Sequence, residues 1–252
     1  SQIGQLRPFL GQQVFVKIKG VNQNSITAPQ NYFLKSFASC VAPSSNLVSW
    51  WKAEGNTNDE SNTNSASLIN NPIFDTGIVG QAFRLDGQND YIQVSDHPSL
   101  DFSTEFTLEM WVQTHNLSQS QAIISKHECK LGATGYNLGL RPDVGGLKLS
   151  AQAGAPGITC GFPGYGWVLS TQPVITDDLY HHVAVTYKGG TQPVIKLYVD
   201  GAEVPTQTIL NAPIQVNNTN RPFLMGTTLV SDGGGPTYPS YFFNGHLDEI
   251  SA

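Results

Sequence analysis

The stretch Tyr180–Val204 constrains the fold most, because its apolar residues alternate with other residues along two short runs. Its sequence is YHHVAVTYKGGTQPVIKLYVDGAEV, and its alternating apolar positions are Val183, Val185, Tyr187, Ile195, Leu197 and Val199. Alternation in β-branched and aromatic residues is typical of strands with one buried face. Gly189-Gly190 and Asp200-Gly201 supply turn residues between and after the runs. The stretch therefore predicts a meander of antiparallel strands packed on a core.

The blocks around this stretch resemble, in the same order, the strands of laminin-G-like, concanavalin-A-like jelly-roll domains. HHVAVTY followed by LYVDG is similar to the central hairpin of that family. The other matching blocks are LVSWWKAEGN (Leu47–Asn56), VGQAFRLDGQNDYIQV (Val79–Val94), FTLEMWVQT (Phe106–Thr114), AIISK (Ala122–Lys126) and NGHLDEI (Asn244–Ile250). The resemblance covers Asn46–Ala252 and implies an all-β, two-sheet antiparallel jelly-roll sandwich. The family is functionally broad, so the resemblance indicates a fold rather than one activity.

Composition agrees with an extracellular all-β protein. The 252 residues include 25 Gly and 15 Pro, and only 13% are charged, which suits many short strands joined by turns. The net charge of −6 gives a nucleic-acid partner little support. No apolar run approaches the roughly 20 residues of a membrane-spanning helix. The sequence begins Ser-Gln-Ile, without Met, so we expect a processed chain or an excised piece, secreted or displayed on a cell surface.

Residues 1–45 do not match the family and are predicted to form a separate N-terminal β extension, or the tail of a preceding domain. Gly11–Gly20 alternates as a strand does, and Cys40–Asn46 has the Pro and Ser of a linker. Family members usually continue beyond the closing block, so we expect an unpaired sheet edge near Ala252. The Gly11–Gly20 strand would cover an edge of its own sandwich or of a neighbouring chain, the second case giving a homo-oligomer or filament.

Further strands are expected across the sandwich, at Leu47–Ala53, Ala66–Ile69, Gln81–Asp86, Asp90–Ser95, Phe106–Thr114, Ala122–Lys126, Tyr136–Arg141, Gly146–Gln152, Gly166–Ser170, Gln207–Gln215, Pro222–Gly226 and Tyr241–Ile250. Gln81–Asp86 and Asp90–Ser95 are predicted to pair as a hairpin across Gly87-Gln88-Asn89. Ala153–Gly166 and Ser231–Pro239 are predicted to be loops. No segment has the apolar periodicity of a helix.

Asn89 and Asp90 follow Asp86 at a predicted turn, where clustered oxygen ligands suit calcium. The position is similar to the calcium site of pentraxin and laminin-G-like domains, and Asp232 would complete it from a later loop. The alternative is ordinary turn chemistry, because Asn and Asp favour turns without a metal. A second predicted site joins Glu54 or Asp59 to Asp248 or Glu249, with solvated surface charge as its alternative.

Catalysis has little support in the sequence, and we expect no enzyme. No nucleophile elbow or zinc-protease motif occurs. Glu105 and Glu109 share one strand face and are interpreted as a solvated surface rather than a glycosidase pair. His181 and His182 face opposite sides of a strand, and the resemblance implies that one of them makes a structural hydrogen bond.

The three cysteines are Cys40, Cys129 and Cys160, and none has metal-ligand spacing. A disulfide between Cys129 and Cys160 is predicted, because both are expected in loops that flank adjacent strands. Cys40 is then unpaired or pairs outside the chain. The alternative is three buried thiols.

Aromatic residues in or beside Gly- and Pro-rich loops are the best candidates for ligand contacts, namely Tyr165, Trp167, Tyr238 and Tyr241. Exposed rings stack on sugars or pack against protein partners, although such rings also pin loops to a core. We therefore expect a non-catalytic binding or adhesion module that takes glycans or extracellular proteins. The alternatives are a structural subunit of an extracellular assembly and an accessory domain of a polysaccharide hydrolase.

Overall fold

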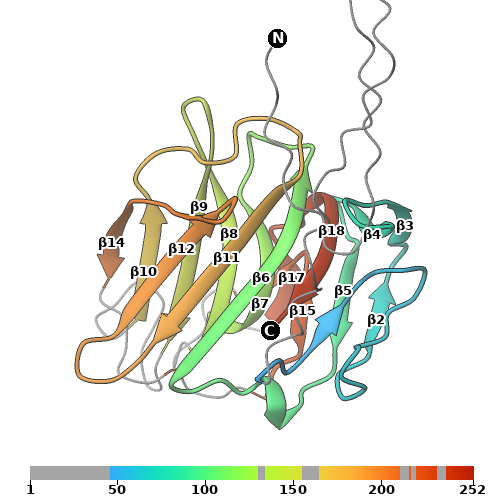
Figure 1. Ribbon diagram of the computed structural model, residues 1–252, viewed down its shortest axis with the longest axis horizontal. Coiled ribbons are helices and arrows are strands. Elements are labelled where there is room, and N and C mark those ends of the chain that lie inside the picture. The colour runs from blue at the N-terminus through green and yellow to red at the C-terminus, as the bar shows by residue number, and fades with distance from the viewer. Residues whose placement is uncertain (1–45, 130–133, 155–164, 211–215, 217–219, 232–236) are drawn as a thin grey trace, which may run out of the picture. The chain divides into compact units, whose positions relative to one another are not determined.

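The computed structural model describes residues 46–129, 134–154, 165–210, 216, 220–231 and 237–252, all within the unit Asn46–Ala252 (Figure 1). The predicted extension 1–45 lies outside these residues. The described strands are β1 (Trp50–Trp51), β2 (Ala66–Ile69), β3 (Ile73–Thr76), β4 (Gln81–Asp86), β5 (Tyr91–Val94), β6 (Glu105–Thr114), β7 (Gln121–Cys129), β8 (Thr134–Asp143), β9 (Gly146–Gly154), β10 (Tyr165–Ser170), β11 (His181–Lys188), β12 (Val194–Val199), β13 (Ala202–Glu203), β14 (Thr206–Leu210), β15 (Phe223–Met225), β16 (Thr228–Ser231), β17 (Thr237–Ser240) and β18 (Asn244–Ser251). A 3₁₀ turn, η1, spans Pro98–Leu100.

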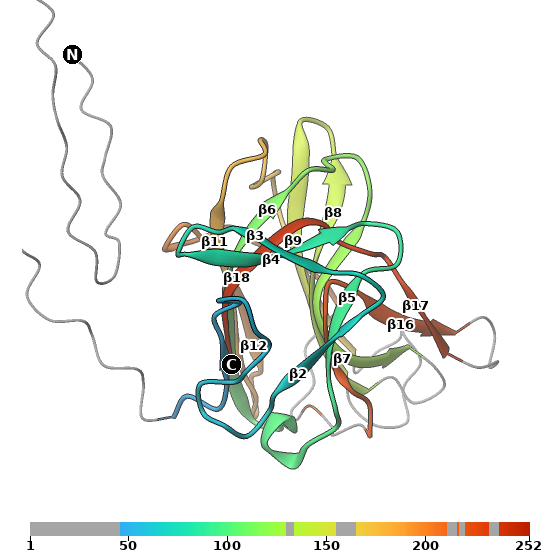
Figure 2. The same cartoon turned by 90° about the vertical axis from the view of Figure 1, so that its right-hand side faces the viewer.

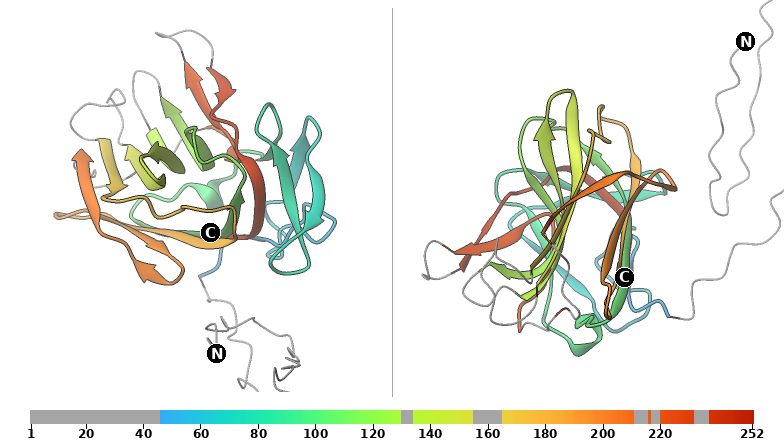
Figure 3. Two further views of the ribbon diagram at one scale, coloured as in Figure 1. Left: turned by 90° about the horizontal axis from the view of Figure 1, so that it is seen from above. Right: turned by 90° about the vertical axis from the view of Figure 1, so that its left-hand side faces the viewer.

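The strands form two sheets packed face to face, which confirms the predicted jelly-roll sandwich. Sheet A has the order β13-β12-β11-β6-β18-β4-β3, with β1 beside β18. Sheet B has the order β14-β10-β9-β8-β7-β15-β5-β2. The hairpin β16–β17 adds to β7 through one parallel pairing, and Figure 2 shows it extending from sheet B. The views of Figure 3 show the two layers, with β11 and β12 in one and β8 to β10 in the other.

The alternating stretch forms the predicted meander. Strand β11 pairs with β12 from Val183↔Val199 to Lys188↔Val194, and β6 lies on the other side of β11. Their alternate residues face sheet B and are buried, as the pattern requires. Trp51 is fully buried and stacks on Phe223 with ring centroids 5.3 Å apart. One of the two adjacent tryptophans therefore enters the core.

The predicted hairpin between Gln81–Asp86 and Asp90–Ser95 is wrong. Strand β4 pairs with β3 and β18 in sheet A, whereas β5 pairs with β2 and β15 in sheet B. The turn between them carries the chain from one sheet to the other. Alternation reveals which side chains are buried but not which strand lies alongside, so two strands joined by a turn need not pair.

The closing strand is not an edge in the described part of the chain, contrary to the expectation of an open edge near Ala252. Strand β18 pairs with β6 on one side and with β4 and β1 on the other. The expected edge at this strand is therefore occupied by the sandwich's own strands, and nothing described requires a second chain there.

Smaller differences concern individual strands. The predicted strand Leu47–Ala53 is reduced to Trp50–Trp51, and β3 was not predicted. Strand β17 occupies part of the predicted loop Ser231–Pro239, and the last strand begins at Asn244 rather than Tyr241. The described residues contain no helix with the length and apolar character needed to cross a membrane.

Candidate functional site

Two of the four predicted aromatic residues meet at one cation on the outer face of sheet B. The guanidinium carbon of Arg141 lies 5.8 Å from the ring centroid of Trp167 and 5.7 Å from that of Tyr241. Both distances are within the range of cation–π attraction. Three separate elements supply these groups: β8, β10 and the turn before β18. We call Arg141, Trp167 and Tyr241 the aromatic–arginine cluster.

An irregularity in strand pairing positions Trp167. Strand β10 shifts register against β14 between Trp167 and Val168, and such a bulge changes the direction in which a side chain projects. The indole Nε1 donates to Ser150 Oγ at 3.0 Å, which fixes the orientation of the ring. The half-buried indole is thus held in place at the surface of the sheet.

Backbone conformation positions Tyr241. This residue has φ 56°, in the left-handed region that a non-glycine residue seldom occupies. Its carbonyl oxygen accepts the Ala122 N–H at 2.8 Å, which ties the turn to β7. Its side chain is 45% exposed, so much of the ring is open to a ligand.

The alternation of β8 turns Arg141 outward. Tyr136, Leu138 and Leu140 are buried in the core between the sheets, so Asn137 and Arg141 project from the opposite face. Arg141 was not among the predicted site residues. The signal that could have found it was the one cation of β8, which stands at an outward position of the strand's alternation.

A row of polar side chains crosses the same face beside the cluster. The register places Trp167, Gln152, Asn137 and Ser125 next to one another on β10, β9, β8 and β7. Asn137 Nδ2 donates to Gln152 Oε1 at 2.8 Å. Ser125 is fully buried and its hydroxyl is hydrogen-bonded to that of Thr228, so the polar groups beside the Trp167 ring are the amides of Asn137 and Gln152. A ring beside amide groups is a usual lining of a site for a polar organic ligand.

The other two predicted aromatic residues are placed less decisively. Tyr238 is 43% exposed on β17, where it pairs with Val230. The backbone of Tyr165 begins β10 opposite Gly154, and its side chain lies outside the described part of the structure. Only Trp167 and Tyr241 of the predicted set are shown to converge on Arg141.

The predicted calcium turn lines a cavity of ≈ 380 Å³, together with Arg84, His115 and Asn244. Asp86 Oδ1 accepts the N–H groups of Gln88, Asn89 and Asp90, which is ordinary turn capping. Partial burial acts to raise the pKa of Asp86, but these three hydrogen bonds together lower it below its usual value. Asp90 Oδ1 accepts the Asn71 N–H at 2.9 Å.

These turn residues fit calcium in part. The Oδ2 atoms of Asp86 and Asp90 accept no hydrogen bond from any described residue, so they remain free for a ligand. No group of three or more His, Cys, Asp or Glu side chains in the described ranges has metal-binding geometry, so water and backbone oxygens would have to complete the shell. Asp232 lies outside the described residues.

The second predicted acidic site has a different explanation for each carboxylate. Asp59 accepts hydrogen bonds from the amides of Trp50, Ser61, Thr63 and Asn64 and from the Ser61 hydroxyl. Glu249 accepts the Trp50 Nε1–H at 2.6 Å, and Glu54 accepts the Gln81 N–H at 3.2 Å. These contacts give the acids structural roles, and the metal hypothesis for them stays a prediction.

Asp248 is the one member of this set with a buried oxygen that has no hydrogen-bond partner among the described residues. It is fully buried; Oδ2 accepts the N–H groups of Ile78 and Val79, while Oδ1 has no hydrogen-bond partner among the described residues. Burial raises the pKa of Asp248 to about 7, against the lowering effect of the two amides. Loss of hydration disfavours the charged form, so this acid changes its protonation state near neutral pH.

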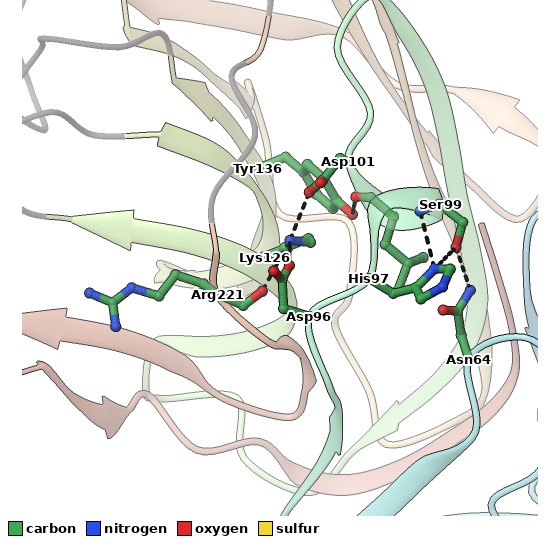
Figure 4. Close-up of polar contacts among 9 residues, drawn as sticks. Asn64, Asp96, His97, Ser99, Asp101, Lys126, Tyr136 and Arg221 are labelled. Atoms are coloured by element: carbon green, nitrogen blue, oxygen red, sulfur yellow. Dashed lines mark hydrogen bonds and ion pairs between the residues drawn. The ribbon is translucent and has the colours of Figure 1, made fainter.

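A buried lysine lies inside the sandwich near η1 (Figure 4). Lys126 Nζ is 2.7 Å from Asp96 Oδ1 and 2.9 Å from Asp101 Oδ1, and it donates to the Arg221 carbonyl at 3.0 Å. Tyr136 donates to the Leu100 carbonyl beside it, and burial, then the charge of Asp101, raises the Tyr136 pKa well above its usual value. Because a buried ammonium with matched partners is satisfied, this cluster joins η1 to β7 and is structural.

The histidines and paired glutamates have the roles expected of them. His181 contacts Asp177 and Asp200 at 3.0 and 2.9 Å, which fixes the ends of two loops. Glu105 and Glu109 are exposed on the outer face of sheet A. Cys129 ends β7, but its side chain and Cys160 lie outside the described residues, so their disulfide stays a prediction.

A family model described as the concanavalin A-like lectin/glucanases superfamily matches residues 86–252. The chain belongs to this superfamily. The match agrees with the resemblance found in the strand blocks and with the two observed sheets. No curated protein matches the sequence.

Solved structures with the same fold include sugar-binding and toxin domains. Domain 4 of AbnA, an extracellular arabinanase from Geobacillus stearothermophilus solved with arabinotriose, is 18% identical with a TM-score of 0.56, over 81% of this chain and 90% of that one. The binding domain of Paraclostridial Mosquitocidal Protein 1 is 16% identical with a TM-score of 0.57, over 82% and 48%. The binding domain of botulinum neurotoxin DC, solved with SialylT, is 10% identical with a TM-score of 0.56, over 82% and 47%. This chain thus spans about half the length of the toxin domains, and at these identities the likeness shows the fold alone.

Proposed function

We propose that the chain is a non-catalytic glycan-binding module that takes a sugar on the outer face of sheet B. The observation that carries the proposal is the aromatic–arginine cluster, since three separate elements bring two rings to one guanidinium. Rings stack on the apolar faces of sugars, and the adjacent amides of Asn137 and Gln152 suit sugar hydroxyls. Similar folds with arabinotriose and SialylT support a sugar as the ligand.

Strands β8, β9 and β10, as far as the structure describes them, hold no pair of acids near the cluster, which supports binding rather than hydrolysis. Among β8, β9 and β10, the one carboxylate is Asp143, and it forms an ion pair with Lys148. A glycosidase needs two carboxylates on either side of the scissile bond. Glu105 and Glu109, the acids considered in the sequence, are on sheet A, whose outer face points the opposite way.

The proposed setting is extracellular, with the module attaching its carrier to a glycan-bearing surface or to an extracellular protein. Low charge, abundant Gly and Pro and the relation to an extracellular arabinanase domain support this setting. The alternative of an assembly through strand addition now depends on the predicted Gly11–Gly20 strand alone, because β18 is paired on both sides.

The test is binding to an array of glycans that includes arabinotriose and sialylated oligosaccharides, followed by titration of the hits. Trp167→Ala and Tyr241→Ala should each weaken binding roughly tenfold, equivalent to about 1.4 kcal/mol. Trp111→Ala is the matched control, because Trp111 is a half-buried tryptophan on sheet A. Equal affinity of all three folded variants would exclude the face as the binding site.

Calcium is proposed at the turn formed by Asp86, Asn89 and Asp90, where it would supply charge to the cavity and rigidity to the crossing between the sheets. The free Oδ2 atoms of the two aspartates support this proposal. Calcium should raise the melting temperature and chelator should reverse the rise, because a ligand of the native state stabilises it. Asp90→Asn should remove the response, whereas Asp143→Asn, a distant exposed acid, should keep it. A chelator-insensitive melting curve for calcium-loaded protein would rule the site out.

A further inference from the structure

The guanidinium of Arg141 has no charged or hydrogen-bonding partner in the part of the chain that the structure describes. No described carboxylate lies within ion-pair distance of it, and its contacts are the rings of Trp167 and Tyr241. A guanidinium carries five N–H donors in a planar fork and never loses its charge. Its half-buried position reduces access of water to those donors. The donors are thus available to an acceptor that the described residues do not provide.

The surrounding charge strengthens this argument. Strands β8, β9 and β10 carry three charged side chains, Arg141, Asp143 and Lys148, and the last two are paired with each other. Arg141 therefore leaves a local positive charge on a chain whose net charge is −6. A neutral sugar would use the guanidinium only as a hydrogen-bond donor to its hydroxyls, whereas an oxyanion would also balance its charge.

We infer that the sugar taken by this face carries an oxyanion, a carboxylate or a sulfate, that binds the guanidinium of Arg141. This inference rests on the glycan-binding function proposed above and specifies its ligand. Arg forms paired hydrogen bonds with planar oxyanions, and their charge makes these bonds stronger than those to a neutral hydroxyl. The rings of Trp167 and Tyr241 hold the guanidinium in place before binding, which reduces the entropy lost when the ligand arrives.

A structural role for Arg141 is the competing explanation. In that case the cation serves to attach the exposed Tyr241 ring to the Trp167 ring, and the charge has no ligand. The two explanations differ in what happens when the charge is removed. A structural clamp predicts an equal loss for every sugar, whereas a recognition residue predicts a larger loss for the acidic sugar.

The experiment titrates the whole chain with four defined probes: trigalacturonate, its methyl ester, a sulfated galactose trisaccharide and neutral arabinotriose. The expected result is binding of trigalacturonate or of the sulfated probe at least tenfold tighter than the methyl ester and arabinotriose, as expected for a charge-assisted hydrogen bond. Preference for trigalacturonate identifies the carboxylate as the source of the oxyanion, and preference for the sulfated probe identifies the sulfate. Higher salt should weaken the preferred probe more than the neutral ones.

Arg141→Gln should remove that preference, because the affinity for the preferred acidic probe should fall at least tenfold more than the affinity for the neutral probes. Lys148→Gln is the matched control, since it removes a nearby charge that already has a partner, and it should keep the preference. Melting temperatures of both variants report whether each remains folded. Should Arg141→Gln not fold, Arg141→Lys keeps the charge without the planar fork and should lose the preference in part.

The outcomes separate this inference from the proposed function. Binding of neutral probes as tight as that of acidic ones, dependent on Trp167, overturns the oxyanion and leaves the glycan face standing. An equal loss for all probes in Arg141→Gln overturns recognition in favour of the clamp. If no probe and no array glycan binds in a manner that depends on Trp167, the glycan-binding function falls, and the inference falls with it.

Discussion

Asp248 should make the stability of the sandwich depend on pH, and Asp248→Asn should remove that dependence. The carboxyl is fully buried, and its pKa is raised from 3.8 to about 7. An acid whose pKa is raised by folding binds its proton more tightly in the folded state than in the unfolded one. Its contribution is therefore complete below the unfolded pKa and is lost as pH rises through the folded pKa. The window of loss lies between about pH 4 and pH 7.

The size of the effect follows from the shift. Each unit of pKa shift corresponds to about 1.36 kcal/mol of unfolding free energy. The contribution of Asp248 therefore falls by roughly 4 kcal/mol across the whole window, and by roughly 2–3 kcal/mol between pH 5 and pH 8. The amide oxygen introduced by Asp248→Asn would still accept the N–H groups of Ile78 and Val79, which Asp248 Oδ2 now satisfies. The cost of the substitution itself, an amide group without a partner, does not change with pH. The difference between the two proteins thus isolates the titration.

The assay is urea unfolding followed by tryptophan fluorescence at pH 5, 6.5 and 8, with chelator present throughout. The wild type should lose roughly 2–3 kcal/mol of unfolding free energy from pH 5 to pH 8 relative to Asp248→Asn. His246, whose pKa is lowered by burial and then by His115, titrates in both proteins and cancels in the comparison. Parallel pH profiles for the two proteins would refute the reasoning, because they would show that the buried carboxyl has no raised pKa.

Three further substitutions test the packing and the buried polar groups, each by the shift in the urea midpoint. Trp51→Ala should lower the unfolding free energy by about 3–5 kcal/mol, because removal of the fully buried ring leaves a cavity beside Phe223. Trp50→Ala should lower it clearly less, and equal losses would contradict the assignment of Trp51 to the core. Asp59→Ala should lower the unfolding free energy by about 2–4 kcal/mol, because four backbone amides lose their acceptor. Asp143→Ala, the exposed control, should barely change the urea midpoint, and equal shifts would contradict a structural role for Asp59. Lys126→Ala should cost about 3–5 kcal/mol of unfolding free energy with little salt dependence, because it leaves Asp96 and Asp101 without their cation. A loss that vanished in high salt would contradict a buried ion cluster at Lys126.

The sequence predicted the regular parts of the fold because burial on one face of a strand leaves a period of two in the residues. Val183, Val185 and Tyr187 were assigned to a buried face, and all three are buried. The partner of each strand was harder to predict. Asp86 and Asp90 flank a turn rich in Gly and Asn, which commonly joins paired strands, yet β4 and β5 belong to different sheets.

The geometry of that turn explains the failure. Gly87 has φ 74°, and a Cβ atom built on it would lie 2.6 Å from Cβ of Asn244, so the chain passes close against β18 as it leaves sheet A. Asn244 lies far along the sequence, and no local pattern around Gly87 reports it. A glycine at such a turn therefore does not reveal the pairing of the flanking strands, because it serves both in hairpin turns and in turns that carry the chain from one sheet to the other.

The candidate site shows the same division between local and distant information. Trp167 and Tyr241 were selected because they are aromatic and stand near loops, which is a property of each residue alone. Arg141 became significant only through the positions of the other two. Those positions depend on a register shift in β10 and on the left-handed φ of Tyr241, neither of which leaves a periodic trace. The two sheets follow from regular alternation, whereas the cluster depends on departures from it. The two aromatic residues could therefore be proposed from the sequence, but their convergence on Arg141 could be found only in the three-dimensional structure.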